Sequence, residues 1–310
     1  MNKINKFQRD EVIKIIYKAA QKNKKIFFLS ADFGAPALDD FRLNLKNQFV
    51  HLGICEQNMI DFANGMALEG AKVYVYAMAP FLSVRCYEQH KTATCLMNTN
   101  VCSIVTGIGL SYANSGPTHY STEDFACLRA LPNSLIFTAS DPSVAREIAK
   151  KTLKINKPTF IRLDRKSNND FNSKVSSKEI DNGFRFLKRN QNPKLAIISQ
   201  GTIIERAIKA YNLLDKKMSS KINIIDLIQS KPFPKSLKSH LNSYKEILTL
   251  DEQTNVGSLG SLLKENIDKK ITTLALPDEF IFENLGRDKL LDKNNLSVTN
   301  ILSKIKNLLK

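Results

Sequence analysis

The sequence predicts two consecutive doubly wound α/β domains with mainly parallel sheets. Short apolar runs alternate with longer segments of helical periodicity, and this alternation is typical of strand–helix–strand units. The apolar runs are continuous, as in strands that are buried on both faces of a parallel sheet. A polar stretch from Lys166 to about Asn192 interrupts the alternation, which indicates a boundary between two domains.

The first half is expected to begin with a helix over about residues 6–21, because its apolar residues recur at helical spacing. Apolar runs predict the strands that follow, and amphipathic segments predict the helices between them. In chain order, the strands are expected at 25–30, 49–53, 72–77, 101–107, 134–139 and 159–163, and the helices at 56–70, 80–97, 123–131 and 142–153. Gly70 and Pro80 match the residues preferred at a helix end and in a first helical turn.

The alternation resumes in the second half and predicts a smaller α/β domain. Strands are expected at 194–201, 222–227, 246–250 and 271–276, and helices at 202–217, 257–266 and in the last residues up to Lys310. We therefore expect domains over residues 1–168 and 192–310, joined by a polar linker over 169–191.

The composition limits the class of protein. The 310 residues are 43% hydrophobic and 25% charged, which suits two domains that each bury a core. No apolar run reaches the roughly 18 residues of a membrane span, and the polar N-terminus does not resemble a signal peptide. The five cysteines show no paired CxxC spacing, so neither a disulfide framework nor a structural zinc site is expected. A reducing cytoplasm is the expected location.

The net charge of +16 raises the question of nucleic-acid binding. The lysines are scattered over polar faces, however, and no base-reading motif accompanies them. We therefore expect no nucleic-acid partner. A diffuse positive charge is better suited to attracting anionic ligands or an acidic partner subunit.

A glycine-containing loop, "GIGLSYANSG", follows a predicted strand, as a phosphate-binding loop would. A dinucleotide fingerprint requires glycines in GxGxxG spacing, but Tyr112 stands at the third position. Gly107 and Gly109 are therefore expected only to permit a tight turn.

Of the four histidines, His119 is the strongest candidate for a functional role. It lies in "SGPTHYSTED", at the carboxyl end of a predicted strand, where open parallel sheets bind ligands. His90 and His240 lie in lysine-rich helical segments and are expected to be solvated. His51 is expected to be a structural histidine in a strand.

Three acidic residues follow strand ends. Asp141 precedes Pro142 and a helix, which is the position of an N-cap. Asp32 is explained equally well as a turn residue. Glu56, in "HLGICEQNM", is explained equally well as an acidic residue that faces the positive end of a helix.

The order of these segments nevertheless resembles a known family. The segments "SADFGAP", "HLGICEQNM", "APFLSVRCYEQ", "SGPTHYSTEDFACLRALPN" and "IRLDRK" resemble the pyrimidine-binding domain of transketolases. The segments "LAIISQGTIIERAIKA", "INIIDLIQSKPF" and "LDEQTNVGSLGSLL" resemble the transketolase C-terminal domain. The resemblance covers essentially the whole chain, and the Gly-Ile-x-Glu-x-x-Met form of the helix start is rather specific.

The resemblance implies that the chain binds thiamine diphosphate, a cofactor that carries the difficult chemistry itself. The family glutamate that matches Glu56 hydrogen-bonds the aminopyrimidine and promotes its activation, so Glu56 is expected to be catalytic. Phe81 and Tyr87 match aromatic residues that hold the pyrimidine ring. Asp32 matches an aspartate that lines the cofactor site.

The resemblance also implies roles in substrate binding. His119 matches a catalytic loop histidine that contacts a substrate oxygen. Arg9 and Arg165 match arginines that hold the sugar phosphate, a role suited to the guanidinium fork.

At four positions the chain departs from the family pattern. Ser115 replaces an aspartate that binds a substrate hydroxyl, and Gly107 replaces a histidine that contacts the phosphate. Pro36 and Val84 replace a phosphate-binding serine and an aromatic residue. The acceptor pocket is therefore expected to be altered, and the resemblance does not fix the donor and acceptor sugars.

Full-length transketolases carry a further domain, whose Gly-Asp-Gly segment binds Mg²⁺ and the diphosphate. This sequence contains no such segment. The resemblance thus implies a separate subunit that supplies the Mg²⁺ ligands, a heterotetramer with two copies of each chain, and transfer of a two-carbon ketol unit between sugar phosphates. The alternatives are a 1-deoxyxylulose-phosphate synthase-like subunit, a 2-oxoacid dehydrogenase β-like subunit, or a non-catalytic scaffold subunit.

Overall fold

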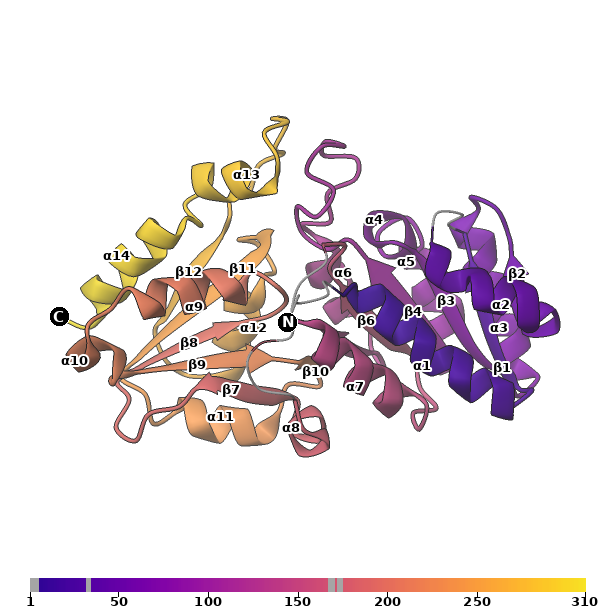
Figure 1. Cartoon of the computed structure of the whole chain (residues 1–310), viewed down its shortest axis with the longest axis horizontal. Coiled ribbons are helices and arrows are strands. Elements are labelled where there is room, and N and C mark those ends of the chain that lie inside the picture. Colours follow the sequence, from indigo (N-terminus) through magenta and orange to yellow (C-terminus); the bar gives the residue numbers. More distant parts are fainter. Residues whose placement is uncertain (1–5, 32–34, 167–170, 172–174) are drawn as a thin grey trace, which may run out of the picture.

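A computed structural model describes residues 6–31, 35–166, 171 and 175–310. It confirms the predicted fold class, because two α/β units lie side by side, each built on a mainly parallel sheet (Figure 1). None of the helices in these ranges is long and apolar enough to cross a bilayer.

The first domain is built on a seven-stranded sheet of order β10-β5-β6-β4-β3-β1-β2. Its own strands are β1 (Ile26–Ser30), β2 (Phe49–His51), β3 (Lys72–Met78), β4 (Val101–Thr106), β5 (Leu135–Thr138) and β6 (Thr159–Leu163). Its helices are α1 (Gln8–Lys22), α2 (Asp39–Asn44), α3 (Glu56–Leu68), α4 (Ala79–Leu82), α5 (Tyr87–Gln89), α6 (Asp124–Ala130) and α7 (Pro142–Thr152), with short turns η1 (Pro36–Leu38), η2 (Lys46–Gln48) and η3 (His90–Cys95).

The strands of this sheet alternate their side chains between two apolar layers. Phe28 and Tyr74 belong to the core that also contains residues of α1 and α7, whereas Leu29 and Val73 belong to the core that contains residues of α3. Successive residues of a strand point to opposite faces, so continuous apolar runs are what a sheet covered on both faces requires.

The second domain is built on a five-stranded sheet of order β12-β11-β8-β9-β7. Its elements are α8 (Ser177–Asn182), β7 (Phe184–Lys188), β8 (Leu195–Ser199), α9 (Ile204–Asn212), α10 (Lys216–Ser219), β9 (Ile222–Leu227), α11 (Lys235–Leu241), β11 (Glu246–Thr254), α12 (Leu259–Asn266), β12 (Ile271–Leu276), α13 (Arg287–Lys293) and α14 (Val298–Leu308). Only β7 runs antiparallel to its neighbour.

The expected linker over residues 169–191 contains regular structure. Helix α8 begins with a reciprocal capping box between Ser176 and Glu179 and ends at Gly183, which has a left-handed conformation. Strand β7 follows and joins the second sheet. The segment is polar because it contains a short surface helix that is stabilised by its caps. Such a helix has no apolar periodicity by which the sequence could reveal it.

Two further elements differ from the sequence-based expectation. The helix expected over 80–97 is broken between α4 and α5 and continues as the π-helical turn η3. Strand β10 (Gln229–Lys231) was not expected; it leaves the second domain and pairs antiparallel with β5 of the first. The first sheet is therefore completed by the second half of the chain.

A buried ionic cluster also joins the two domains. Arg185 of β7 donates to Asp226 of β9 at 2.9 Å and to Asp141 of the first domain at 2.6 Å, and all three side chains are at most 1% exposed. Asp141 also accepts from Val144 N, which confirms its expected role as the N-cap of α7. Burial raises the pKa of Asp226 despite its pairing with Arg185.

His90 is not the solvated residue that its lysine-rich context suggested. In η3 it is completely buried, its Nε2 lies 2.8 Å from Leu82 O, and its ring packs edge-on against Phe160. Burial lowers the pKa of His90 to about 4. The π-helical turn directs this side chain inward, which a lysine count along the segment does not predict.

This burial predicts a pH-dependent stability. The unfolded chain takes up a proton at His90 below its ordinary pKa of 6.5, whereas the folded chain resists protonation down to about pH 4. Stability is therefore lost as the pH falls from 6.5 to 4, by roughly 3 kcal/mol. Urea unfolding at pH 7 and pH 4.5 should show a larger loss for the native chain than for His90→Gln. Equal losses would contradict this assignment.

Candidate functional site

Glu56 is the first residue of α3, directly after the turn that follows β2. Its side chain is 4% exposed, and its Oε2 accepts a hydrogen bond from Arg85 Nη1 at 2.7 Å. A carboxylate at a helix N-terminus is stabilised by the helix dipole. The helix dipole alone does not account for the burial of Glu56. Burying a carboxylate is unfavourable unless a partner pairs with it, and Arg85 is that partner.

Phe81 lies next to this pair. The Cζ atom of Arg85 is 4.1 Å from the centre of the Phe81 ring, and the His119 ring meets Phe81 edge-on at 5.3 Å. Phe81 thus connects the region of Glu56 with the loop that carries His119. Pro80 in the first turn of α4 places Phe81 at the carboxyl end of β3.

His119 is half-buried in the loop between β4 and α6. Its Nδ1 lies 2.9 Å from Thr118 Oγ1, and its ring centre lies 6.5 Å from that of Tyr112. The Cζ atom of Arg165 is 4.7 Å from the Tyr112 ring centre. Four of the expected site residues, Glu56, Phe81, His119 and Arg165, therefore fall into one continuous series of contacts through Arg85 and Tyr112.

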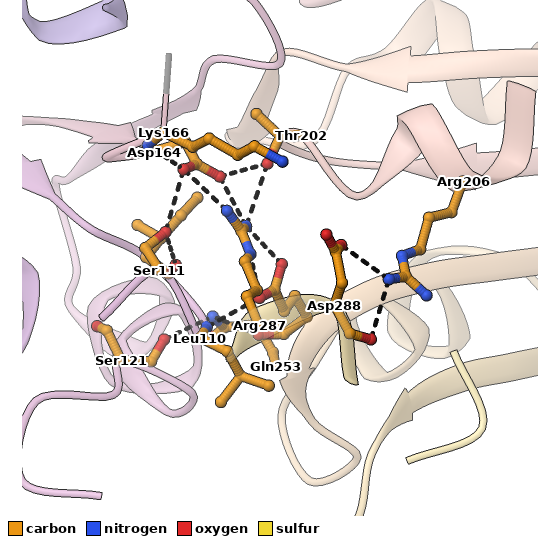
Figure 2. A network of polar contacts seen from close by, with 12 residues as sticks. Leu110, Ser111, Ser121, Asp164, Lys166, Thr202, Arg206, Gln253, Arg287 and Asp288 are labelled. Atoms are coloured by element: carbon orange, nitrogen blue, oxygen red, sulfur yellow. Dashed lines mark hydrogen bonds and ion pairs between the residues drawn. The ribbon is translucent and has the colours of Figure 1, made fainter. Parts of the chain in front are cut away.

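The second domain holds the loop that carries His119. Glu252 of β11 accepts from Leu110 N at 2.9 Å, and Gln253 Nε2 donates to Ser121 O at 2.9 Å (Figure 2). Tyr120 is nearly buried, and its hydroxyl lies 3.0 Å from Ala113 O and 3.2 Å from Glu283 O, so its one proton can be donated to either carbonyl. The position of the loop therefore depends on both halves of the chain.

Arg287 of α13 is the central cation of this anchoring network. It pairs with Asp164 at 2.6 Å and with Glu252 at 2.7 Å, and it lies between the two domains (Figure 2). Burial would raise the pKa of Asp164, but Arg287 and the hydrogen bonds from Thr202 and Lys166 outweigh it and lower that pKa. Asp164 also precedes Arg165, so the same network fixes the backbone beside that arginine.

Gly109 is required where the loop passes the second domain. Its φ is +61°, and a Cβ atom there would lie 2.8 Å from Glu252 Cγ and 2.9 Å from Glu252 O. Gly116, in the same loop, has a φ of +76° but open space around it. Both glycines have a left-handed backbone conformation, but only a Cβ atom at residue 109 would clash with a neighbouring residue.

We expect Gly109→Ala to cost about 2–4 kcal/mol of unfolding free energy, from left-handed strain plus overpacking. Gly116→Ala should cost only about 1 kcal/mol, from the strain alone. Chemical denaturation of both variants measures the difference. Equal losses of unfolding free energy would mean that the close contact between residue 109 and Glu252 does not contribute to the cost.

Gly107 has a positive φ of +93°, which agrees with the expected turn. It also makes room for Tyr112, because a Cβ at residue 107 would lie 2.0 Å from Tyr112 Cε2. Any side chain at this position would therefore displace Tyr112. Gly107 departs from the family pattern, and the position of the Tyr112 ring depends on that departure.

The remaining expected residues are less closely tied to this series. Arg9 Nε pairs with Asp10, and its neighbour Gln8 accepts from Asp164 N at 2.9 Å, which brings the start of α1 beside the end of β6. Tyr87 is half-buried and packs against the cluster that contains Phe125. Asp32 lies outside the described residues.

Sequence reasoning missed two residues of the series, Arg85 and Tyr112. Arg85 is four residues after Phe81, in the turn between α4 and α5, and it contacts both Phe81 and Glu56. In the sequence, Tyr112 stands out only as the residue that interrupts a glycine pattern. No signal in the sequence specifies the contact of Arg85 with Glu56 or that of Tyr112 with Arg165, since each joins segments far apart in the chain.

The groups around Glu56 suit a flat heterocycle that carries an N–H. An aromatic face lies beside a buried carboxylate, and the planar guanidinium of Arg85 already makes both contacts. The described part of the chain contains no group of three or more His, Cys, Asp or Glu side chains placed to hold a metal ion.

Two family models match the chain. Residues 9–169 match "Transketolase, pyrimidine binding domain", and residues 185–301 match "Transketolase, C-terminal domain". The first match alone spans more than half of the 310 residues.

Similar proteins include a 1-deoxy-D-xylulose-5-phosphate synthase from Syntrophomonas wolfei, 28% identical over 94% of this chain. The chain spans only 46% of that relative's length. A subunit of the apulose-4-phosphate transketolase from Phocaeicola vulgatus is 27% identical, and the alignment covers 87% of this chain and 90% of that protein.

Two solved structures have similar folds. A structure described as a split-gene transketolase, an inactive β4 tetramer, superposes with a TM-score of 0.84 at 25% identity and covers 99% of both chains. The transketolase of Campylobacter jejuni superposes with a TM-score of 0.84 at 20% identity over 98% of this chain and 47% of that chain. The second likeness concerns the fold alone.

Proposed function

Since this chain belongs to the transketolase family, we propose that it is the pyrimidine-binding subunit of a thiamine-diphosphate-dependent transketolase. The enzyme would transfer a two-carbon ketol unit from a ketose phosphate to an aldose acceptor. The observation that supports this proposal most is the series of contacts from Glu56 through Phe81 to His119.

We further propose that a separate subunit supplies the diphosphate-binding half of the site and the Mg²⁺ ligands. Two proteins of similar length support this: one is named as a subunit of a transketolase, and the other is described as a split-gene transketolase. A heterotetramer with two copies of each chain is the proposed assembly.

In this proposal, thiamine diphosphate supplies the nucleophilic carbon that accepts the two-carbon unit. Glu56 would hydrogen-bond a ring nitrogen of the pyrimidine and control the proton shared between the two groups. Phe81 supports the face of the ring, with Tyr87 and Asp32 as further cofactor residues. The low exposure of Glu56 keeps water from competing for the carboxylate.

His119 and two arginines would handle the substrate. The contact between His119 Nδ1 and Thr118 leaves Nε2 to meet a substrate oxygen. Arg165 and Arg9 would bind the sugar phosphate, because guanidinium groups pair with phosphate bidentately. The loop departures at Ser115 and Gly107 would then determine which acceptor fits.

Reconstitution tests this proposal. The purified chain is mixed with a family subunit that carries the diphosphate-binding domain, together with thiamine diphosphate and Mg²⁺. Ketol transfer between sugar phosphates should occur in the mixture and in neither subunit alone. Cofactor-loaded mixtures without ketose-dependent chemistry would instead favour a scaffold role.

A decarboxylating activity is the second candidate, because a 1-deoxy-D-xylulose-5-phosphate synthase is among the similar proteins. Such a subunit would consume pyruvate and release carbon dioxide in the same mixture. Carbon dioxide release with pyruvate and an aldose phosphate, without transfer from a ketose, would establish this alternative in place of ketol transfer.

A further inference from the structure

Arg85 and Tyr112 are the residues of the contact series to which no role has been given, and Arg85 is the one that contacts Glu56. Its Nη1 lies 2.7 Å from Glu56 Oε2, and its Cζ lies 4.1 Å from the centre of the Phe81 ring. The Arg85 side chain is 42% exposed, whereas that of Glu56 is 4% exposed. The guanidinium therefore covers a buried carboxylate on its solvent side.

This arrangement has a physical reason. A buried carboxylate without a partner is strongly unfavourable, so the chain needs an N–H donor at Glu56 whenever no ligand supplies one. A guanidinium is flat, carries its donors in its plane and stacks on aromatic faces. Among the described residues, Arg85 is the side chain that donates a hydrogen bond to Glu56.

A pyrimidine ring held by Glu56 and Phe81 requires the same two contacts. Its ring nitrogen, once it has taken up a proton, donates to the carboxylate, and its flat face lies beside the phenyl ring. Resting on the proposed function, we propose that Arg85 competes with the pyrimidine of the cofactor for Glu56 and Phe81. Cofactor binding then requires the Arg85 side chain to leave.

The surroundings of Arg85 permit this movement. The residue lies in the turn between α4 and α5, and in the described part of the chain its guanidinium has no hydrogen bond other than that to Glu56. Its partly exposed side chain would be hydrated after release. Only the molecules in which Arg85 has left Glu56 can bind the cofactor. The apparent affinity is therefore the intrinsic affinity multiplied by the fraction of such molecules.

Binding of a cofactor fragment to the full chain tests the competition without enzyme activity. The probe is 4-amino-5-hydroxymethyl-2-methylpyrimidine, the pyrimidine half of thiamine, titrated under ligand-observed NMR. Arg85→Ala should bind it ~10-fold more tightly than the native chain, because the competing cation is gone. Arg189→Ala is the matched control, since Arg189 is also exposed and lies 4.9 Å over a ring, that of Phe186. It should bind as the native chain does.

The outcomes separate this inference from the proposed function. Equal or weaker binding by Arg85→Ala, together with loss of binding in Glu56→Gln, would overturn the competition and leave Glu56 as a pyrimidine-binding residue. Absence of binding in the native chain and in every variant would contradict Glu56 and Phe81 as a preformed pyrimidine site, and this inference with it, whereas reconstitution with the partner subunit tests the proposed function separately. Thermal unfolding of each variant establishes that the fold is retained.

Discussion

Glu56→Ala is expected to lower ketol-transfer turnover of the reconstituted enzyme by at least ~10²–10⁴-fold, the range typical of a lost acid–base group. The variant removes the buried carboxylate that pairs with Arg85, whose guanidinium lies over Phe81. Its fold should persist, because the partly exposed Arg85 can be hydrated once its partner is gone. Steady-state kinetics with saturating cofactor measures the effect.

Glu69→Ala is the matched control for this experiment. Glu69 is exposed at the other end of α3, so its removal should leave turnover close to that of the native enzyme. Near-native turnover in Glu56→Ala would contradict the assigned mechanism, and Glu56 would then be a helix-start residue in a dipole-matched position.

Arg185→Leu is expected to destabilise the chain by about 3–5 kcal/mol, because it leaves a buried charge without its partner. Asp226 and Asp141 both depend on Arg185, and each is completely buried. Since this cluster joins the two domains, the free energy of unfolding measured in urea should fall for the whole chain.

The loss in Arg185→Leu should also depend on pH. Burial already raises the pKa of Asp226, and without Arg185 the carboxyl would protonate at still higher pH. The destabilisation should therefore be smaller at pH 5 than at pH 8, since the protonated acid is the less unfavourable group to bury. Arg189→Leu, an exposed position, should change stability by only about 0.5 kcal/mol. Equal effects of the two substitutions would show that the cluster is not stabilising.

Much of the first domain follows from its sequence, because each buried strand is a short apolar run and each helix has an apolar face. The members of the candidate site came instead from the resemblance to the transketolase family, and Glu56 and Phe81 both follow strands whose carboxyl ends meet at one edge of the sheet. Elements held mainly by polar contacts or by pairing between domains could not be predicted. The capped helix α8 and the strand β10 are examples.

The contacts between the residues of the candidate site were harder to predict from the sequence than the identities of those residues. Arg85 lies in the turn between α4 and α5 and pairs with Glu56, 29 residues earlier in the chain, and neither residue's sequence context specifies that contact. Tyr112 fills the space beside Gly107, a pairing that depends on the path of the loop. His90 shows the same limitation, since a π-helical turn decides whether it faces solvent.

Calorimetric titration of thiamine diphosphate with Mg²⁺ tests the central claim most directly. It is carried out on this chain alone and on its mixture with a diphosphate-binding family subunit. A shared site predicts tight binding only in the mixture, and Glu56→Ala should weaken it there. Equally tight binding by the lone chain, or no binding in a mixture that forms a stable complex, would contradict the assignment of this chain as the pyrimidine-binding half of a shared active site.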